Sequence, residues 1–270
     1  MQPRIISEYC HFERREKSPR GGLLRFARND KIAQIIFWIA TAAFLSACVS
    51  AQPAIVAPTV EPTPLSPPTV LARENEMALI ENARRGDVMV VKKLLAQGAN
   101  VHAHDADGVT ALIAAAYGNH LKTARVLIAA GADVNIQDAT KQSAFLIATS
   151  EGYVELLKLT LQAGADVHRT DSYNGTGLIR AAHRGHVEVI QELLKTEIKI
   201  NHVNRLGWTA LLEAIILGDG GARHTEVVRL LVNAGADVNL ADNQRVTPLA
   251  HARQRGYADI IAILERAGAR

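Results

Sequence analysis

The chain contains little cysteine and few aromatic residues, and each shortage limits what it can be. Only 2 of its 270 residues are cysteine and only 4% are aromatic. Both cysteines, Cys10 and Cys48, lie near the amino terminus, so a disulfide framework cannot hold the rest of the chain together. Since 48% of the residues are hydrophobic, the chain can still bury a continuous core, which must consist mainly of Ala, Leu, Val and Ile.

The chain also lacks an excess of charge of one sign once its first residues are set aside. The formal net charge is +3, but residues 1–47 hold eight Lys or Arg and four Asp or Glu. The remaining residues therefore hold 22 basic and 23 acidic side chains. This near-neutral balance gives no support for nucleic-acid binding.

Sequence signatures of catalytic sites are missing too. There is no Gly-x-Ser-x-Gly or His-Glu-x-x-His, and no Lys-Ser/Thr follows the glycine-rich stretch Gly218–Gly221. His102 and His104 have the spacing of half a metal site, but no cysteine or carboxylate cluster completes it. We therefore expect no catalytic residue, no metal and no cofactor, and predict that the protein is not an enzyme.

What the chain does contain is a repeat of 33 residues. Hydroxyl residues recur at this interval, except that the last interval is 38: Thr110, Ser143, Thr176, Thr209 and Thr247. Two further series keep the same step: Gly86, Asn119, Gly152, Gly185, Gly218, Gly256, and Gly98, Gly131, Gly164, Glu197, Gly235, Gly268. Three series that shift together indicate stacked units, none of which buries its apolar face alone.

Local motifs identify the kind of unit. One unit opens with Asp105-Ala-Asp-Gly-Val-Thr-Ala-Leu112, another has Gly185-His-Val-Glu-Val-Ile190 in its middle, and Gly131-Ala-Asp-Val-Asn135 recurs in nearly the same form from Gly164 and Gly235. These motifs resemble the ankyrin repeat. The resemblance implies an all-α, ankyrin-repeat solenoid, in which helix-turn-helix units are joined by β-hairpin loops.

The resemblance covers residues 72–270 and divides them into a capping half-unit and five full repeats. The half-unit is 72–104, and the repeats are 105–137, 138–170, 171–203, 204–241 and 242–270. In each repeat the Thr or Ser is expected to cap the first helix through its hydroxyl. Glycine or asparagine is expected to end the helices in a conformation with positive φ.

Three departures from the pattern predict local differences. Glu197 stands where the other units have glycine, so we expect either strain or a changed turn there. Gly175 and Gly177 flank the capping Thr176, and we expect that helix to start loosely. Residues 219–223 form the insertion, which we expect to be a mobile loop between the two helices of its unit.

The amino-terminal part has the features of a targeting signal. Arg25, Arg28 and Lys31 precede an apolar run that ends in Leu45-Ser-Ala-Cys48. This ending resembles the lipobox of bacterial lipoproteins, which implies a signal peptide over 1–47 and lipidation of Cys48. The alternative is an uncleaved membrane anchor, although the run is short for a span. The long basic region also suggests that translation starts downstream, near Leu23 or Leu24.

The segment after Cys48 is rich in proline and predicts a semi-rigid tether over 48–71. Val49 follows the cysteine where lipoproteins of the inner membrane often carry Asp. By that resemblance we expect the protein in the bacterial cell envelope, lipid-anchored in the outer membrane and facing the periplasm.

The resemblance also indicates which side chains meet a partner, because variable hairpin and first-helix positions line the concave surface of ankyrin arrays. Carried over unit by unit, these positions are Asp107, Val109, Tyr117, Gln142, Glu151, Tyr173, His183, Arg184, Arg205, Leu206, Trp208, Gln244 and Arg255. Tyrosine, tryptophan and arginine dominate interaction hot spots. We therefore predict a non-catalytic module that binds another protein, whose identity the sequence leaves open.

Two alternatives to this function remain at this stage. The array could be a structural spacer of the envelope, or it could inhibit or protect a neighbouring enzyme. A small-molecule or metal enzyme would need a convergent polar pocket that the sequence does not reveal.

Overall fold

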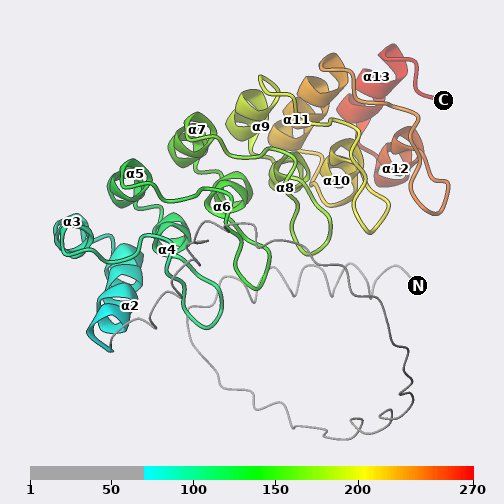
Figure 1. Ribbon diagram of the computed structural model, residues 1–270. Helices are drawn as coiled ribbons and strands as arrows, with labels where there is room; N and C mark the ends of the chain where they lie inside the picture. Colours follow the sequence, from blue (N-terminus) through cyan, green and yellow to red (C-terminus); the bar gives the residue numbers. More distant parts are fainter. Residues whose placement is uncertain (1–69) are drawn as a thin grey trace, which may run out of the picture. The chain divides into compact units, whose positions relative to one another are not determined.

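The computed structural model describes residues 70–270, which form two rows of helices (Figure 1). The first helices of the units are α2 (Val70–Arg85), α4 (Ala111–Tyr117), α6 (Ala144–Glu151), α8 (Gly177–Arg184), α10 (Ala210–Ile216) and α12 (Pro248–Arg255). The second helices are α3 (Val88–Ala96), α5 (Leu121–Ala129), α7 (Val154–Gln162), α9 (Val187–Leu193), α11 (Ala222–Asn233) and α13 (Ala258–Arg266). Each helix packs against its partner and against its counterparts in adjacent units. The predicted all-α solenoid is confirmed.

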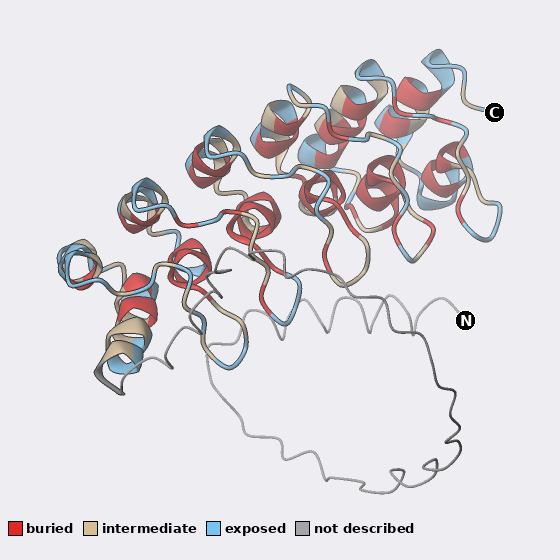
Figure 2. Cartoon of the chain, viewed as in Figure 1, coloured by how far each residue is buried: buried red, intermediate tan, exposed pale blue. Residues whose placement is uncertain are grey.

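The two rows of helices are buried to different extents (Figure 2). Every residue of α6 from Ala144 to Ser150 is buried, because α6 is covered by its second helix and by the first helices on either side. The second helix α7 instead buries one side, which carries Leu156, Leu157, Leu159 and Thr160. The first helices therefore form the centre of the core and the second helices cover it.

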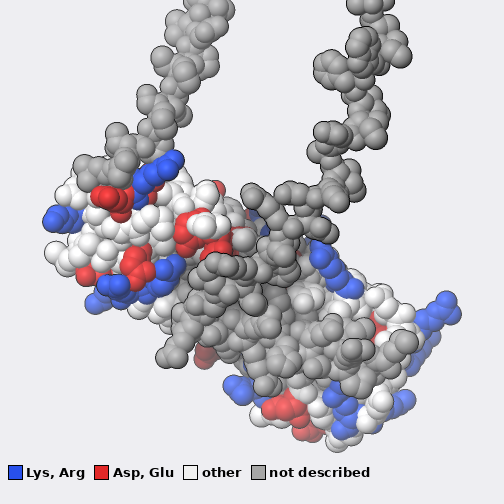
Figure 3. All heavy atoms as spheres, turned by 90° about the horizontal axis from the view of Figure 1, so that it is seen from below, with Lys and Arg blue, Asp and Glu red and all other residues white. Residues whose placement is uncertain are grey.

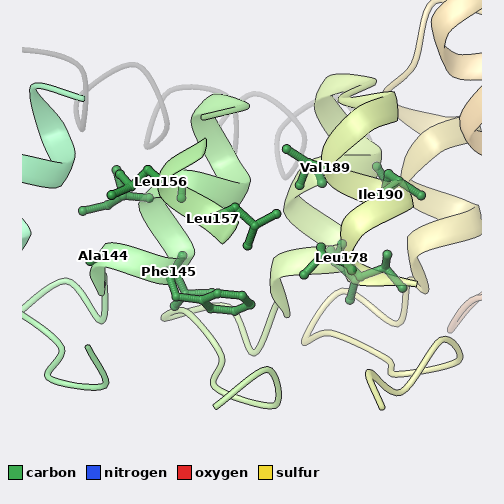
Figure 4. Close-up of a cluster of buried hydrophobic side chains, with 14 of the residues drawn as sticks. Ala144, Phe145, Leu156, Leu157, Leu178, Val189 and Ile190 are labelled. Atoms are coloured by element: carbon green, nitrogen blue, oxygen red, sulfur yellow. The ribbon is translucent and has the colours of Figure 1, made fainter. Parts of the chain in front are cut away.

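A continuous apolar cluster joins neighbouring units. Phe145 of α6 and Leu178 of α8 lie near Leu156 and Leu157 of α7 and Ile190 of α9, and all five are fully buried (Figure 4). Burying such a side chain is worth roughly 1.5–3 kcal/mol relative to leaving it in water. Helices this short are marginal in isolation. Packing between units therefore stabilises each of them.

The expected capping of the first helices is confirmed in all five full repeats. The capping hydroxyl accepts a hydrogen bond from the amide three residues later, as in Thr110 to Ile113 and Ser143 to Leu146. Thr176, Thr209 and Thr247 do the same. Pro248 occupies the first position of α12, where a missing N–H costs nothing.

The helix ends also follow the prediction, except at Gly218 and Glu197. Helix α10 has Leu217 as its cap with φ of −102°, and Gly218 does not take a positive φ. Gly152, Gly185 and Gly256 end first helices with φ of 77°, 68° and 70°, and Asn119 takes the same role with φ of 50°. Glu197 avoids this conformation, since α9 ends at Leu193 and a tighter turn follows. The changed turn that the sequence predicts at Glu197 is therefore present.

The expectation of a loose start for α8 is wrong. Thr176 caps α8 as in the other units, and Gly177 is buried as its first residue. A Cβ at Gly177 would lie 2.9 Å from Thr149 Cγ2 and 3.2 Å from Phe145 Cε1. Glycine is present because α6 packs closely there, and this packing holds the helix start in place.

The insertion is not an unattached loop either. It adds a turn to the start of α11, which has 12 residues and begins at Ala222. Asp219 Oδ1 lies 2.7 Å from His224 Nδ1, and Tyr257 donates a hydrogen bond of 2.9 Å to the Gly218 carbonyl. These contacts hold the segment in place at both ends. The glycine-rich sequence alone did not predict them.

The expected signal peptide, the lipidation at Cys48 and the tether up to residue 69 lie outside the described residues. The first described helix, α2, begins two residues before the expected start of the capping half-unit at 72. From residue 70 onward, no helix is both long enough and apolar enough to cross a membrane.

Candidate functional site

All five hairpin tips have the same turn, in which the side chain of the first residue accepts hydrogen bonds from backbone amides of the tip. We define the tips as residues 105–109, 138–142, 171–175, 204–208 and 242–246. The first residue of each tip accepts hydrogen bonds through Oδ1 from the amides two and four positions later, at 2.7–3.0 Å. Those residues are Asp105, Asp138, Asp171, Asn204 and Asp242. Asp and Asn favour such turns because a short side chain can reach the backbone.

The other terminal atom of these side chains, Oδ2 of aspartate or Nδ2 of asparagine, contacts side chains of the array itself. Asp138 Oδ2 accepts from Tyr117 Oη at 3.1 Å, and Asp242 Oδ2 lies 2.9 Å from His251 Nε2. Asn204 donates to Glu213 Oε1 at 2.7 Å, a contact buried under the tip. Four of the five turn residues are themselves buried, and the charges of the three aspartates among them, Asp138, Asp171 and Asp242, are therefore withdrawn from the exposed surface.

Backbone hydrogen bonds join the first tip to the second and the third tip to the fourth. Ala139 donates to the Asp107 carbonyl at 2.8 Å, and Arg205 donates to the Tyr173 carbonyl at 2.9 Å. All five hairpins project on the same side of the array (Figure 1). Together with the carboxyl ends of the first helices they make one surface, which we call the hairpin face.

The fourth residue of every tip has a left-handed backbone. In chain order these residues are Gly108, Lys141, Asn174, Gly207 and Arg245, with φ of 77°, 67°, 60°, 82° and 63°. Glycine and asparagine tolerate this region, whereas a longer L-residue is strained by roughly 1–2 kcal/mol. Two of the five units therefore hold a long basic side chain where the backbone favours glycine.

The structure places most of the predicted contact residues at the surface of the hairpin face. Asp107, Tyr117, Arg205, Gln244 and Arg255 are exposed. A second group is half-buried between tips and helix ends: Val109, Glu151, Tyr173, His183, Arg184, Leu206 and Trp208. Val109 packs against the core cluster, so it offers a partner less than its neighbours do.

Gln142 does not lie at the surface as expected. Only 3% of it is exposed, and its amide is bonded to Asp138 Oδ1 at 2.9 Å. Because so little of Gln142 is exposed, it is removed from the contact set. Two other predicted residues have structural contacts, because Arg184 Nη1 lies 3.6 Å from Glu151 Oε1 across adjacent units.

Sequence reasoning missed two exposed residues of the hairpin face, Lys141 and Arg245. Each lies at a tip position that is glycine in other units. The signal was available, since residues 108, 141, 174, 207 and 245 keep the step of the repeat. Without the backbone angles, however, nothing marked that position as strained.

A row of histidines lies at the starts of second helices, next to the carboxyl ends of first helices. His120 Nε2 lies 3.0 Å from the Arg84 carbonyl, and His186 Nε2 lies 3.0 Å from the Ser150 carbonyl. His224 makes the same contact with the His183 carbonyl. Burial lowers the pKa of His186 below its ordinary value, which favours the neutral ring. These histidines therefore connect successive units.

A groove of about 490 Å³ lies beside this row, lined by His186, Glu188 and Arg223 among others. Between residues 70 and 270 there is no group of three or more His, Cys, Asp or Glu placed to hold a metal ion.

Comparison with known proteins gives the same kind of unit along the whole array. The family model for ankyrin repeats, in three copies, matches residues 53–138, 77–171, 145–242 and 178–270. A stretch of 64 residues is 48% identical to YahD of Escherichia coli (strain K12), which is described as an ankyrin repeat protein. That match spans 24% of this chain and 32% of the relative, so it covers about a third of the relative's length.

Solved structures agree over a longer range. An ankyrin repeat domain from Acinetobacter baumannii AYE is 47% identical, with a TM-score of 0.70, over 72% of this chain and 100% of that one. The ankyrin repeat protein EF0377 is 34% identical with a TM-score of 0.68, over 71% of this chain and 98% of that one. The human ASB11 ankyrin repeat domain is 28% identical with a TM-score of 0.61, over 71% and 84%. The chain belongs to the ankyrin repeat family, whose domains are generally protein–protein interaction modules.

Proposed function

We propose that this protein is a non-catalytic module that binds one partner protein across its hairpin face. The observation that carries the proposal is the contrast between tip backbone and tip side chains. The backbone of all five tips is the same turn, held by the same pair of hydrogen bonds. Backbone hydrogen bonds also join the first tip to the second and the third to the fourth. The exposed side chains on this fixed support differ from unit to unit, as in Asp107, Arg205 and Gln244.

A preformed surface favours specific binding, because little conformational entropy is lost when the partner docks. Tyr173 and Trp208 lie half-buried on adjacent tips, where part of each ring remains accessible. Rings that are already held in place are the residues on which binding energy concentrates. We assign them the central contacts of the interface, with the exposed tip residues around them.

The localisation follows from the amino-terminal sequence. We propose that the signal peptide over 1–47 is removed, that Cys48 is lipidated, and that residues 48–71 tether the array to the outer membrane on its periplasmic side. In that setting the partner is another envelope protein. A partner that is an enzyme would make the array its inhibitor or protector, whereas a spacer would have no specific partner.

Affinity capture from detergent-solubilised envelopes tests this proposal. The full chain is compared with the variants Trp208→Ala and Tyr173→Ala, each checked for an unchanged circular dichroism spectrum. Removing a hot-spot ring costs about 2 kcal/mol or more, so each variant should retain only a few per cent of the captured partner. Equal capture by all three chains contradicts the proposed surface, and no specific capture by the wild type supports the spacer.

The same preparation tests the anchor. The wild type should sediment with membranes, and Cys48→Ser should remain in the soluble fraction or as unprocessed precursor. Sedimentation of processed Cys48→Ser with membranes would contradict lipid anchoring.

A further inference from the structure

The charges exposed at the hairpin tips change sign along the array. At the first tip the exposed charge is Asp107, and at later tips the exposed charges are Lys141, Arg205 and Arg245. The aspartates that open the later tips, Asp138, Asp171 and Asp242, are buried and bonded inward. Arg255, exposed at the end of α12, adds a further positive charge. From the second repeat onward the tips therefore present only positive charge.

These basic side chains have no acidic partner within the array. Among residues 70–270, Lys141, Arg205 and Arg245 form no ion pair and donate no side-chain hydrogen bond. Some other surface cations of the same array are paired, such as Lys195 with Glu192 at 2.9 Å and Lys158 with Glu155 at 3.0 Å, whereas Lys122 and Arg125 on α5 form no ion pair among the described residues. The basic tip residues, as we call Lys141, Arg205 and Arg245, are therefore available to an outside anion.

Two of the three basic tip residues also lower the stability of the fold, because their backbone is strained. Lys141 and Arg245 adopt φ of 67° and 63°, where Gly108 and Gly207 occupy the equivalent positions. Strained backbone that serves no packing contact is characteristic of functional positions. The strain and the missing partners are separate observations, and both point to a binding role for these side chains.

Figure 3 shows the array from below the view of Figure 1, with Lys and Arg at both of its ends and Asp and Glu among them. The positive charge of the tips is therefore a matter of the particular residues Lys141, Arg205 and Arg245 rather than of the whole molecule.

We infer that the hairpin face binds an acidic segment of its partner protein, an extended stretch whose Asp or Glu side chains pair with the basic tip residues. The inference rests on the proposed function and adds the chemistry of the partner. Guanidinium groups suit carboxylates because two parallel hydrogen bonds can form. An apolar or aromatic side chain of the same segment would lie on Tyr173 and Trp208.

The spacing between units sets the length of the acidic segment. Helices in a row pack about 8–10 Å apart, so the three steps from the unit of Lys141 to that of Arg245 span roughly 30 Å. An extended chain covers this distance with about nine residues. A protein segment is favoured over nucleic acid, because the first tip presents Asp107 and the array carries no net excess of basic residues.

The test uses a fluorescein-labelled peptide of about fifteen residues that alternates Glu with Ser and contains one central Phe. Binding to the full chain is followed by fluorescence anisotropy at about 50 and 300 mM salt. The variant combines Lys141→Gln, Arg205→Gln and Arg245→Gln, which removes the charges but keeps the side-chain size and the strained backbone. The matched control combines Lys92→Gln, Lys122→Gln and Arg125→Gln, three exposed cations on the second helices α3 and α5.

We expect the tip variant to weaken binding of the acidic peptide by about tenfold at low salt, with a smaller difference at high salt, since exposed pairs are individually weak and screened. The control variant should bind within about twofold of the wild type. Equal affinity of tip and control variants overturns the inference. Tighter binding of phosphatidylglycerol vesicles or of single-stranded oligothymidylate than of the peptide overturns it as well.

Capture of the natural partner separates this inference from the proposed function. If Trp208→Ala loses the partner while the tip variant retains it in full, the acidic chemistry is wrong and the binding surface stands. If neither change affects capture, the surface itself is wrong.

Discussion

At the scale of single residues, one equivalent position of the first helices is apolar in the first two repeats and ionisable in the last three. It holds Ala114 and Ile147 in the first two repeats and Arg180, Glu213 and His251 in the last three, and all five are buried. Each ionisable residue contacts the turn residue of its own hairpin, as Arg180 Nη1 does with Asp171 Oδ2 at 3.5 Å. Buried polar groups persist only with such partners.

These polar pairs were not predictable from helical periodicity, which treats the register as apolar. Each pair joins residues nine positions apart, one in a hairpin and one in a helix. Burial acts to raise the pKa of Asp242, but the Val246 amide and the His251 ring outweigh it, so this pKa lies below its ordinary value. The fold thus provides hydrogen-bond partners for buried ionisable side chains at a position where the sequence pattern predicts an apolar residue.

The strained tip residues lead to a prediction about stability. Replacing Arg245 by glycine removes the penalty of a left-handed L-residue, although glycine loses more entropy on folding. We expect Arg245→Gly to raise the free energy of unfolding by roughly 0.5–1 kcal/mol, measured by urea denaturation. The same change should weaken binding of the acidic peptide.

Arg205→Gly provides the control, because Arg205 lies in the neighbouring tip without a positive φ. It should leave the unfolding free energy unchanged or lower it. A loss of stability in Arg245→Gly equal to that in Arg205→Gly would show that the tip backbone carries no strain.

At the scale of helices, the boundaries were predictable because each has a chemical marker. The capping hydroxyls mark the starts of first helices, and glycine or Asn119 marks their ends. The acceptors of the histidines at the starts of second helices were not predictable, since each accepting carbonyl lies 36 or 41 residues earlier. In the last unit Tyr257 replaces the histidine and reaches the Gly218 carbonyl instead.

The link made by His186 predicts a pH dependence of stability. Burial lowers the pKa of His186, with Arg184 and Arg223 acting in the same direction and the Ser150 carbonyl and Glu151 opposing them. The unfolded chain, with an ordinary histidine pKa of about 6.5, then binds protons more readily than the folded chain. The contribution of the neutral ring is therefore present above about pH 6.5 and is lost as the pH falls below it.

We expect the unfolding free energy of the wild type to decrease more steeply between about pH 7.5 and 5.5 than that of His186→Gln. Urea denaturation of both proteins across this range measures the difference. Glutamine keeps a donor for the Ser150 carbonyl, so the comparison isolates the titration. Parallel curves for the two proteins would exclude a role for His186 in the pH dependence.

At the scale of the whole molecule, the 33-residue period was sufficient to predict the array, because stacked units leave few ways to bury a repeating apolar face. The changed turn at Glu197 was predictable for the same reason. The packing of Gly177 and the contacts that hold residues 219–223 were not, since both depend on side chains of other units.

The proposed binding surface stays a prediction, but the structure shows how far its predicted residues are exposed. Apart from Gln142, which is buried, the positions carried over from the ankyrin pattern are exposed or half-buried. Lys141 and Arg245 became visible only through their backbone angles. We therefore base the proposed docking surface on the shared scaffold, and the proposed chemistry of the partner on local strain and charge.

Site-specific photo-crosslinking tests the central claim most directly. A benzophenone amino acid is placed at Trp208, on the hairpin face, or at Lys122, exposed on the second helix α5, and envelopes are irradiated. The account predicts one discrete crosslinked protein from position 208 and none from position 122. Crosslinks of the same protein from both positions, or from position 122 alone, would contradict it.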